Sequence, residues 1–140
     1  SATTLQECAE LGALLIDNVG NILSRSFNQT IHTHDPTAHA EILVLRQTGH
    51  YVHNYRLLNT TLYVTIEPCV MCMGAIVHAR VERVVFGATD PKWGGAVSIC
   101  NLADDERLNH RVKIVSGVLE AECRSMIQTF FREKRKSVAS

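Results

Sequence analysis

The sequence predicts an α/β fold in which helices pack on a mixed sheet of about five strands. Two apolar runs near its start are separated by turn-forming residues, which indicates an antiparallel hairpin. After the hairpin, short runs rich in β-branched and aromatic residues alternate with segments of helical periodicity, as in parallel strands connected by helices. The chain has 140 residues, enough for one hydrophobic core and too few for two comfortable ones. We therefore expect residues 1–140 to form a single domain.

The expected hairpin is formed by residues 12–28, which read GALLIDNVGNILSRSFN. Asp17 and Gly20, each followed by Asn, lie between its two apolar runs, and such residues are favoured in tight turns. A hairpin adds antiparallel pairing to a sheet whose later strands are joined by helices. The sheet should therefore be mixed.

A helix is expected over residues 35–49, which read DPTAHAEILVLRQTG. Asp35 or Thr37 could accept hydrogen bonds from the free amide groups of its first turn, and Gly49 could end it. One face of this helix should cover the sheet, and it is formed by Ala40, Leu43, Val44 and Gln47.

The rest of the chain continues the alternation of strands and helices. Strands are expected over residues 60–68, 83–89 and 111–118, and a helix over residues 69–80. A last helix is expected near the C-terminus, where apolar residues recur at helical spacing and would pack on the sheet. Those apolar residues are Cys123, Met126, Ile127, Phe130 and Phe131.

Composition excludes several classes of protein. The formal net charge is zero, so no overall attraction to nucleic acid is expected, and any such contact would be local. The five cysteines are an odd number and are dispersed except for one pair, unlike the disulfide framework of a secreted protein. No apolar run is long enough for a membrane helix, and the first residues do not resemble a signal peptide. We therefore expect a cytoplasmic protein without a membrane segment.

Cys69 and Cys72 form a C-x-x-C pair at the expected start of a helix. Residues three apart on a first turn share a face, so both sulfur atoms can reach one ion. By itself the pair fits a metal site or a thiol–disulfide redox couple about equally well. His39 and Glu41 lie at the start of the preceding helix. If both helices start at the same edge of the sheet, His39, Cys69 and Cys72 would surround one point.

A His-Cys-Cys set gives zinc three protein ligands. Structural zinc sites normally have four protein ligands, whereas catalytic sites keep one position for water. Glu41 could fill the fourth position and make the site structural. Alternatively, Glu41 lies one step outside the metal and acts as a base for a bound water.

The motif H-A-E followed by P-C-x-x-C is the signature of zinc nucleobase deaminases. Further segments make the chain resemble the bacterial tRNA adenosine deaminases from about Leu11 to Lys136. These segments include HDPTAHAEI at residues 34–42, NYRLLNTTLYVTIEPCVMCMGAIVHARVERVVFGATDPK at residues 54–92 and NHRVKIVSGVLEAEC at residues 109–123. The resemblance implies a three-layer α/β/α fold of the cytidine deaminase type.

The resemblance also implies roles for individual residues. His39, Cys69 and Cys72 would hold Zn²⁺, and Glu41 would transfer protons. Three further residues, Asn28, Asp90 and Lys92, match family positions that contact the substrate: the first would hydrogen-bond the purine edge and the other two would lie along the RNA. The implied reaction converts adenosine to inosine at the wobble position of a tRNA anticodon loop, and the implied assembly is a homodimer.

The sequence departs from this family near the expected nucleic-acid contacts. Only about ten residues precede Gly12 where the family has a full helix, and the run KWGGAVS stands where a Gly-Ala-Ala-Gly-Ser run is usual. These changes affect substrate fit rather than the zinc chemistry. The alternatives are a free guanine or cytosine deaminase of the same fold, a non-catalytic zinc module that binds RNA or a protein, and a thiol–disulfide oxidoreductase.

Overall fold

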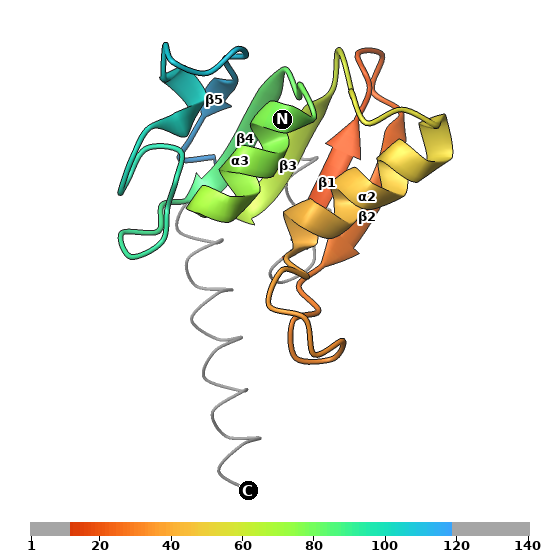
Figure 1. Ribbon diagram of the computed structural model, residues 1–140, viewed down its shortest axis with the longest axis horizontal. Helices are drawn as coiled ribbons and strands as arrows, with labels where there is room; N and C mark the ends of the chain where they lie inside the picture. Colours follow the sequence, from red (N-terminus) through yellow and green to blue (C-terminus); the bar gives the residue numbers. More distant parts are fainter. Residues whose placement is uncertain (1–11, 119–140) are drawn as a thin grey trace, which may run out of the picture.

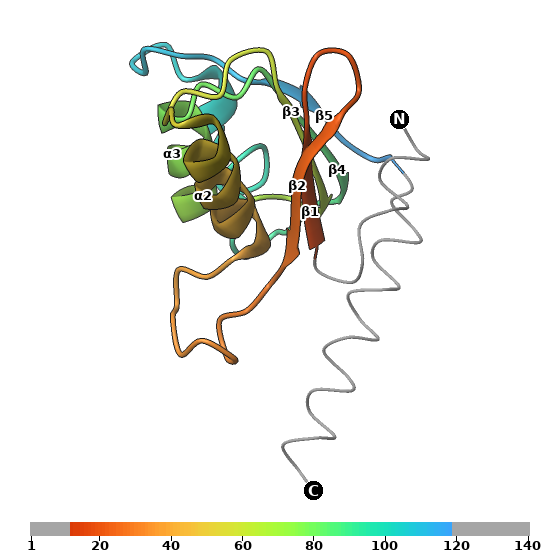
Figure 2. The same cartoon turned by 90° about the vertical axis from the view of Figure 1, so that its right-hand side faces the viewer.

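The computed structural model describes residues 12–118, and they form a five-stranded sheet with helices on one face (Figures 1 and 2). The strands lie in the order β2-β1-β3-β4-β5. In chain order the elements are β1 (Gly12–Ile16), β2 (Ile22–Phe27), α2 (Ala40–Val52), β3 (Thr61–Ile66), α3 (Val70–His78), β4 (Arg83–Ala88), the 3₁₀ turn η1 (Leu102–Asp104) and β5 (Lys113–Val115).

The predicted hairpin is present at one side of the sheet. β1 pairs with β2 and with β3, both antiparallel. Asp17 fixes the turn, because its Oδ1 accepts hydrogen bonds from the backbone N–H groups of Val19 at 3.0 Å and Asn21 at 2.9 Å. Gly20 adopts a φ of 94° in this turn, a left-handed conformation that glycine adopts without steric cost.

The other half of the sheet is parallel, as the helical connections require. β3 pairs with β4 and β4 with β5, both parallel, so the sheet is mixed as predicted. The helices α2 and α3 lie side by side on one face (Figure 2). Under them, Val44 of α2 and Met73 and Ile76 of α3 pack with Val64 and Phe86 of the sheet to form the main core.

The helix α2 begins later and ends later than the sequence predicted. Asp35 does not cap it, because its Oδ1 instead accepts hydrogen bonds from the N–H and Oγ1 of Thr37, which form a turn before the helix. The N-cap residue is His39, and it makes no side-chain capping bond. Gly49 does not end the helix: it continues to Val52, and the N–H of the left-handed residue His53 donates to the carbonyl of Gly49.

The predicted inner face of α2 was partly wrong. Ala40 and Val44 are buried as predicted, but Gln47 is exposed and Ile42 and Thr48 are buried in addition. Ala40, Val44 and Thr48 follow one another at intervals of four residues and form the buried row of α2, while the predicted Leu43 is half-buried. Gln47 Oε1 accepts a hydrogen bond of 2.5 Å from Ser24 Oγ on β2, so its amide lies at the edge of the sheet.

The remaining elements occur where they were predicted, but most are shorter. β5 has three residues where residues 111–118 were expected, and η1 was not foreseen. The predicted C-terminal helix with Cys123 and Phe131 lies outside the described residues. No helix between residues 12 and 118 is long and apolar enough to cross a membrane.

Replacement of Phe86 by Ala tests the main core. Its side chain on β4 is fully buried, so Phe86→Ala should lower the free energy of unfolding by about 3–5 kcal/mol in chemical denaturation. The matched control is Val19→Ala in the hairpin turn, where the side chain is 76% exposed and the expected change is within about 0.5 kcal/mol. Similar losses in both variants would contradict the packing described.

Candidate active site

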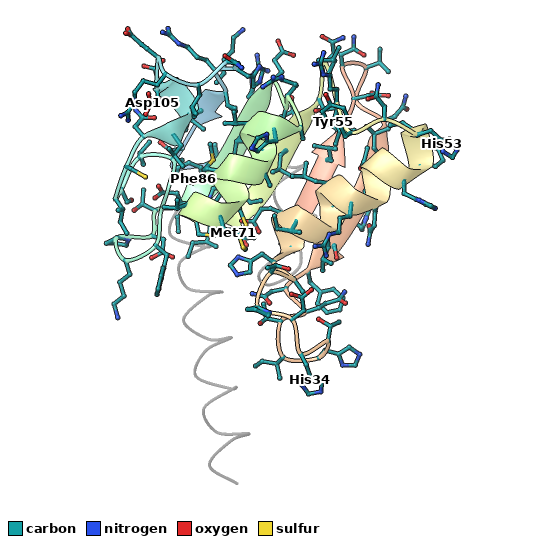
Figure 3. All side chains as sticks on the ribbon, viewed as in Figure 1. His34, His53, Tyr55, Met71, Phe86 and Asp105 are labelled. Carbon is teal, nitrogen blue, oxygen red and sulfur yellow. The ribbon has the colours of Figure 1, made fainter. Side chains whose placement is uncertain are left out.

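The first residues of α2 and α3 meet at the end of the sheet where β3 finishes. His39 is the N-cap residue of α2, and Cys69 is the N-cap residue of α3. Both helices start at the same end of the molecule (Figure 1), and Met71 in the first turn of α3 lies at this end (Figure 3). This arrangement follows from the fold, because the chain enters α3 directly from the carboxyl end of β3 and the two helices run side by side.

The three predicted metal ligands are brought together at this point. His39 Nδ1 lies 3.7 Å from Cys69 Sγ and 3.5 Å from Cys72 Sγ, and the ligand atoms of all three residues lie within 4.8 Å of one another. A tetrahedral zinc ion with ordinary Zn–S and Zn–N bond lengths places a sulfur and a nitrogen ligand about 3.6 Å apart. The observed spacing and donor set therefore fit zinc.

The two cysteine thiols differ in acidity because of their contact with each other and with His39. A hydrogen bond from Cys72, supported by one from His39, lowers the pKa of Cys69 to about 4. The Cys69 sulfur in turn raises the pKa of Cys72 far above its ordinary value. The hydrogen bond with Cys69 also raises the pKa of His39. A cation between these atoms would relieve the repulsion between two thiolates, which is the electrostatic condition for a metal site.

Glu41 lies beside this cluster but is not part of it. Among residues 12–118, the group of side chains that could hold a metal ion contains His39, Cys69 and Cys72, and not Glu41. The Glu41 side chain is buried in the first turn of α2, and burial raises the pKa of its carboxyl group. A carboxylate with a raised pKa is suited to exchange protons near neutral pH.

A pocket of about 530 Å³ opens over the cluster. His39, Glu41 and Cys69 line it, and so do Asn28 and Asp90. This volume is in the range of small-ligand sites. A space large enough for a substrate therefore contacts two candidate metal ligands, a carboxyl group that can carry protons and the polar side chains of Asn28 and Asp90. Hydrolytic metal chemistry requires groups of these kinds.

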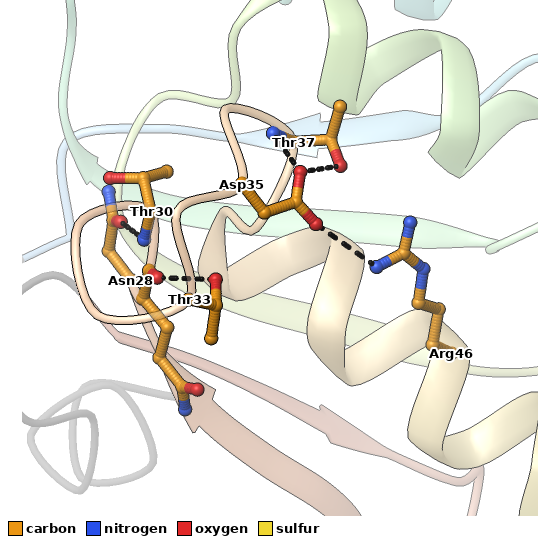
Figure 4. Close-up of polar contacts among 7 residues, drawn as sticks. Asn28, Thr30, Thr33, Asp35, Thr37 and Arg46 are labelled. Carbon is orange, nitrogen blue, oxygen red and sulfur yellow. Dashed lines mark hydrogen bonds and ion pairs between the residues drawn. The ribbon is translucent and has the colours of Figure 1, made fainter.

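Asn28 lies in the loop that joins β2 to α2 (Figure 4). Its Oδ1 accepts a hydrogen bond of 3.0 Å from the N–H of Thr30. This is the turn-forming contact that an Asn in such a loop commonly makes. Because that contact uses the oxygen, the Nδ2 amino group is the part of the side chain that can donate to a ligand in the pocket.

Asp90 and Lys92 differ in their relation to the pocket. Asp90 lines it, and its Oδ1 accepts hydrogen bonds from the N–H groups of Lys92 at 3.1 Å and Trp93 at 3.3 Å. The side chain of Lys92 is exposed and is not among the residues that line the pocket. The structure therefore brings Asn28 and Asp90 to the candidate site, and places Lys92 outside it.

Sequence reasoning missed two residues of the pocket wall, Glu67 and Trp93. The position of Glu67 at the end of an apolar strand could have indicated a role, because a charged residue in such a position is seldom buried without hydrogen-bond partners. Trp93 is the one tryptophan of the chain and stands in a glycine-rich loop, where an aromatic side chain has no core to fill. Neither feature specifies the pocket without the fold.

The geometry defines a class of protein, the zinc-dependent deaminases, and comparison with known proteins agrees. Residues 2–88 match the family model of the cytidine and deoxycytidylate deaminase zinc-binding region. A tRNA-specific adenosine deaminase of Haemophilus influenzae is 49% identical over 126 residues, which cover 90% of this chain and 73% of that protein. The chain belongs to the cytidine and deoxycytidylate deaminase family and, within it, to the tRNA-specific adenosine deaminases.

Solved structures confirm the predicted fold class. One comes from work on A-to-I editing by tRNA:A34 deaminases at the wobble position of transfer RNA. It superimposes with a TM-score of 0.83 at 35% identity, over 89% of this chain and 99% of that chain. A guanine deaminase from Nitrosomonas europaea superimposes with a TM-score of 0.72 at 20% identity, over 85% of this chain and 71% of that chain, which shows the shared fold alone.

The zinc site can be tested by metal content. The wild-type chain should purify with about one zinc ion, and Cys69→Ser and Cys72→Ser should each lose it because two ligands hold zinc far less tightly than three. Both variants, and the wild type treated with a chelator, should also unfold at a lower temperature. Zinc would be measured by mass spectrometry and unfolding by circular dichroism. The control is Cys100→Ser, a half-buried free cysteine outside the ligand group. Equal zinc loss in the control would contradict the assignment.

Proposed function

We propose that this protein hydrolytically deaminates adenosine to inosine at the wobble position of a tRNA anticodon. The observation that carries the proposal is the joint placement of His39, Cys69 and Cys72 beside a buried Glu41, with His39, Glu41 and Cys69 lining one pocket. Its substrate is inferred from the 49% identity to a protein named as a tRNA-specific adenosine deaminase. Fold alone would not choose the substrate, because deaminases of other bases share it.

The reaction requires that a proton be moved between water and the base. Zinc bound by His39, Cys69 and Cys72 would supply Lewis-acid chemistry that activates water near neutral pH. Glu41 then takes a proton from the attacking water on its carboxylate. It delivers that proton to N1 of adenine as the water oxygen bonds to C6, and then carries the remaining proton of that oxygen to the amine, so that the C6–N bond breaks and ammonia leaves. The raised pKa of Glu41 lets it both accept and return a proton in each cycle.

The pocket determines how the base would be held. The Nδ2 group of Asn28 would donate a hydrogen bond to an acceptor nitrogen of the purine, while its Oδ1 keeps the loop in place through Thr30. A base stacked in a duplex cannot enter such a pocket, so the substrate nucleotide has to turn out of its stack. An unpaired loop nucleotide meets this requirement at low cost, which favours an anticodon loop.

Inosine formation tests the proposed function. Incubation of zinc-loaded protein with total tRNA should raise its inosine content, measured by liquid chromatography and mass spectrometry after digestion. Glu41→Gln should lower the rate by about a hundredfold or more, because proton transfer is lost, while zinc content stays at the wild-type level. Loss of zinc in Glu41→Gln would instead make Glu41 a ligand.

The alternatives have their own outcomes in the same assay. Ammonia release from guanine or cytosine, without inosine in tRNA, would make the protein a free-base deaminase. No product from any of these substrates, by a chain that holds zinc, would favour a binding module. The thiol–disulfide alternative explains neither His39 beside the cysteines nor the buried Glu41.

We further infer a homodimer in the cytoplasm, where free thiols such as Cys69 and Cys72 stay reduced. An open groove of about 710 Å³ lies beside α2 and α3 and is lined by apolar side chains such as Ile42 and Leu45 together with polar ones such as Arg46 and His50. A second copy of the chain could cover this surface.

Light scattering after size-exclusion chromatography tests the homodimer. The wild type should elute with twice the mass of one chain, and Leu45→Asp in the groove should shift it to one chain, because a buried unpaired charge opposes association. Val19→Asp, at an exposed position of the hairpin turn, should leave the mass unchanged. A monomeric wild type would contradict the inference.

A further inference from the structure

The carboxylate of Glu67 holds a whole loop through hydrogen bonds. It lies between β3 and α3 with 2% of its surface exposed. Its Oε2 accepts from the N–H groups of Ala96 at 3.1 Å, Val97 at 2.7 Å and Ser98 at 3.0 Å. Its Oε1 accepts from the N–H of Asp90 at 3.0 Å and from Ser98 Oγ at 2.5 Å. One buried carboxylate thus binds both ends of the segment 90–98.

The loop 90–98 fits closely against Glu67 and the start of α3. A Cβ atom on Gly94 would lie 2.4 Å from the Glu67 carboxyl group, and one on Gly95 would lie 2.7 Å from Cα of Val70. The N–H of Gly95 also donates to the carbonyl of Pro68 at 2.8 Å. Only glycine allows this approach, so the loop has a defined position relative to the pocket rather than a free range of positions.

This position brings Trp93 to the pocket wall. Its N–H donates to Asp90 Oδ1, and the Asp90 N–H is itself held by Glu67, so a short chain of hydrogen bonds connects the buried carboxylate to the tryptophan. The Trp93 side chain lines the pocket and is 70% exposed. A large aromatic residue that lines a binding pocket and belongs to neither hydrophobic cluster of residues 12–118 is suited to stack on a planar group of a ligand.

We propose that Trp93 stacks on a nucleobase that flanks the target nucleotide, and that Glu67 is a positioning residue that fixes Trp93 for this contact. This inference rests on the proposed function, because it takes single-stranded RNA as the ligand. Trp93 itself would touch the substrate. Glu67 acts only through the loop, since both of its oxygens are occupied by loop donors.

Kinetics with an anticodon stem–loop RNA test the stacking contact. Trp93→Ala should raise KM about tenfold, a typical cost of one lost base–aromatic stack, and leave kcat within about twofold. Trp93→Phe should recover most of the loss, because it keeps an aromatic face. The matched control is Tyr51→Ala, which removes an aromatic side chain that is 74% exposed at the other end of α2, and it should leave KM unchanged.

A double-mutant cycle tests the role of Glu67. Glu67→Gln replaces one acceptor oxygen by an amino group that faces N–H donors, so it should loosen the loop and raise KM in the same direction as Trp93→Ala. Both changes disrupt the same contact. The KM of the double variant should therefore exceed the KM of the weaker-binding single variant by no more than about twofold. Multiplicative losses in the double variant would overturn the positioning role.

Fluorescence gives a readout that does not depend on activity. Trp93 is the one tryptophan of the chain, so its emission reports on the loop directly. RNA binding should quench this emission in the wild type, and Glu67→Gln should lower its anisotropy in the free protein while zinc content and circular dichroism stay the same. If Glu67→Gln does not fold, Ser98→Ala, which removes one bond to Oε1, should lower the anisotropy instead.

The outcomes separate this inference from the proposed function. A wild type that forms inosine while Trp93→Ala keeps its KM, or while RNA leaves the emission unchanged, overturns the stacking contact only. Anisotropy that stays at the wild-type value in both Glu67→Gln and Ser98→Ala overturns the role of Glu67. A wild type that forms no inosine in any tRNA overturns the proposed function itself.

Discussion

The structure depends on one constraint, the meeting of two helix N-termini at the carboxyl end of the central strand β3. His39 and Cys69 are N-cap residues, and neither uses its side chain to cap its helix. Both side chains instead point to a common centre with Cys72, at distances that fit one zinc ion. The two helices therefore lack side-chain capping hydrogen bonds, each of which typically stabilises a helix by about 1 kcal/mol. A bound cation would offset this missing stabilisation.

Two buried glutamates near this centre have opposite electrostatic properties. Burial raises the pKa of Glu41, which suits a group that exchanges protons. Burial also opposes the charge of Glu67, but hydrogen bonds from Ser98, Val97 and Asp90 outweigh it and keep its pKa below the ordinary value. Glu67 therefore stays charged and structural. Burial dominates at Glu41, whereas the hydrogen bonds from the loop dominate at Glu67, so Glu41 is the one of the two that is suited to exchange protons.

The sequence predicted the strands, the helices and the metal cluster better than it predicted the helix ends and the contacts of the loops. Hydrophobic periodicity located the strands and helices, and the spacing of His39, Cys69 and Cys72 indicated their meeting point. The predicted start of α2 was wrong, because the Asp35 side chain accepts hydrogen bonds from Thr37 in a preceding turn rather than from the first turn of the helix. Asn28 and Asp90 lie at the pocket, and their roles, like those of Glu41 and the ligands, stay predictions. Glu67 was missed because its partners come from a distant loop, and single-sequence patterns do not report contacts of that range.

The central claim is that three protein side chains hold zinc and that Glu41 stands outside the metal. X-ray absorption at the zinc edge measures this most directly, on wild type and on Glu41→Gln. We expect two sulfur ligands at about 2.3 Å and lighter ligands at about 2.0–2.1 Å, with the same spectrum in both proteins. A spectrum that changes in Glu41→Gln, or one that requires other than two sulfur ligands, would contradict the account.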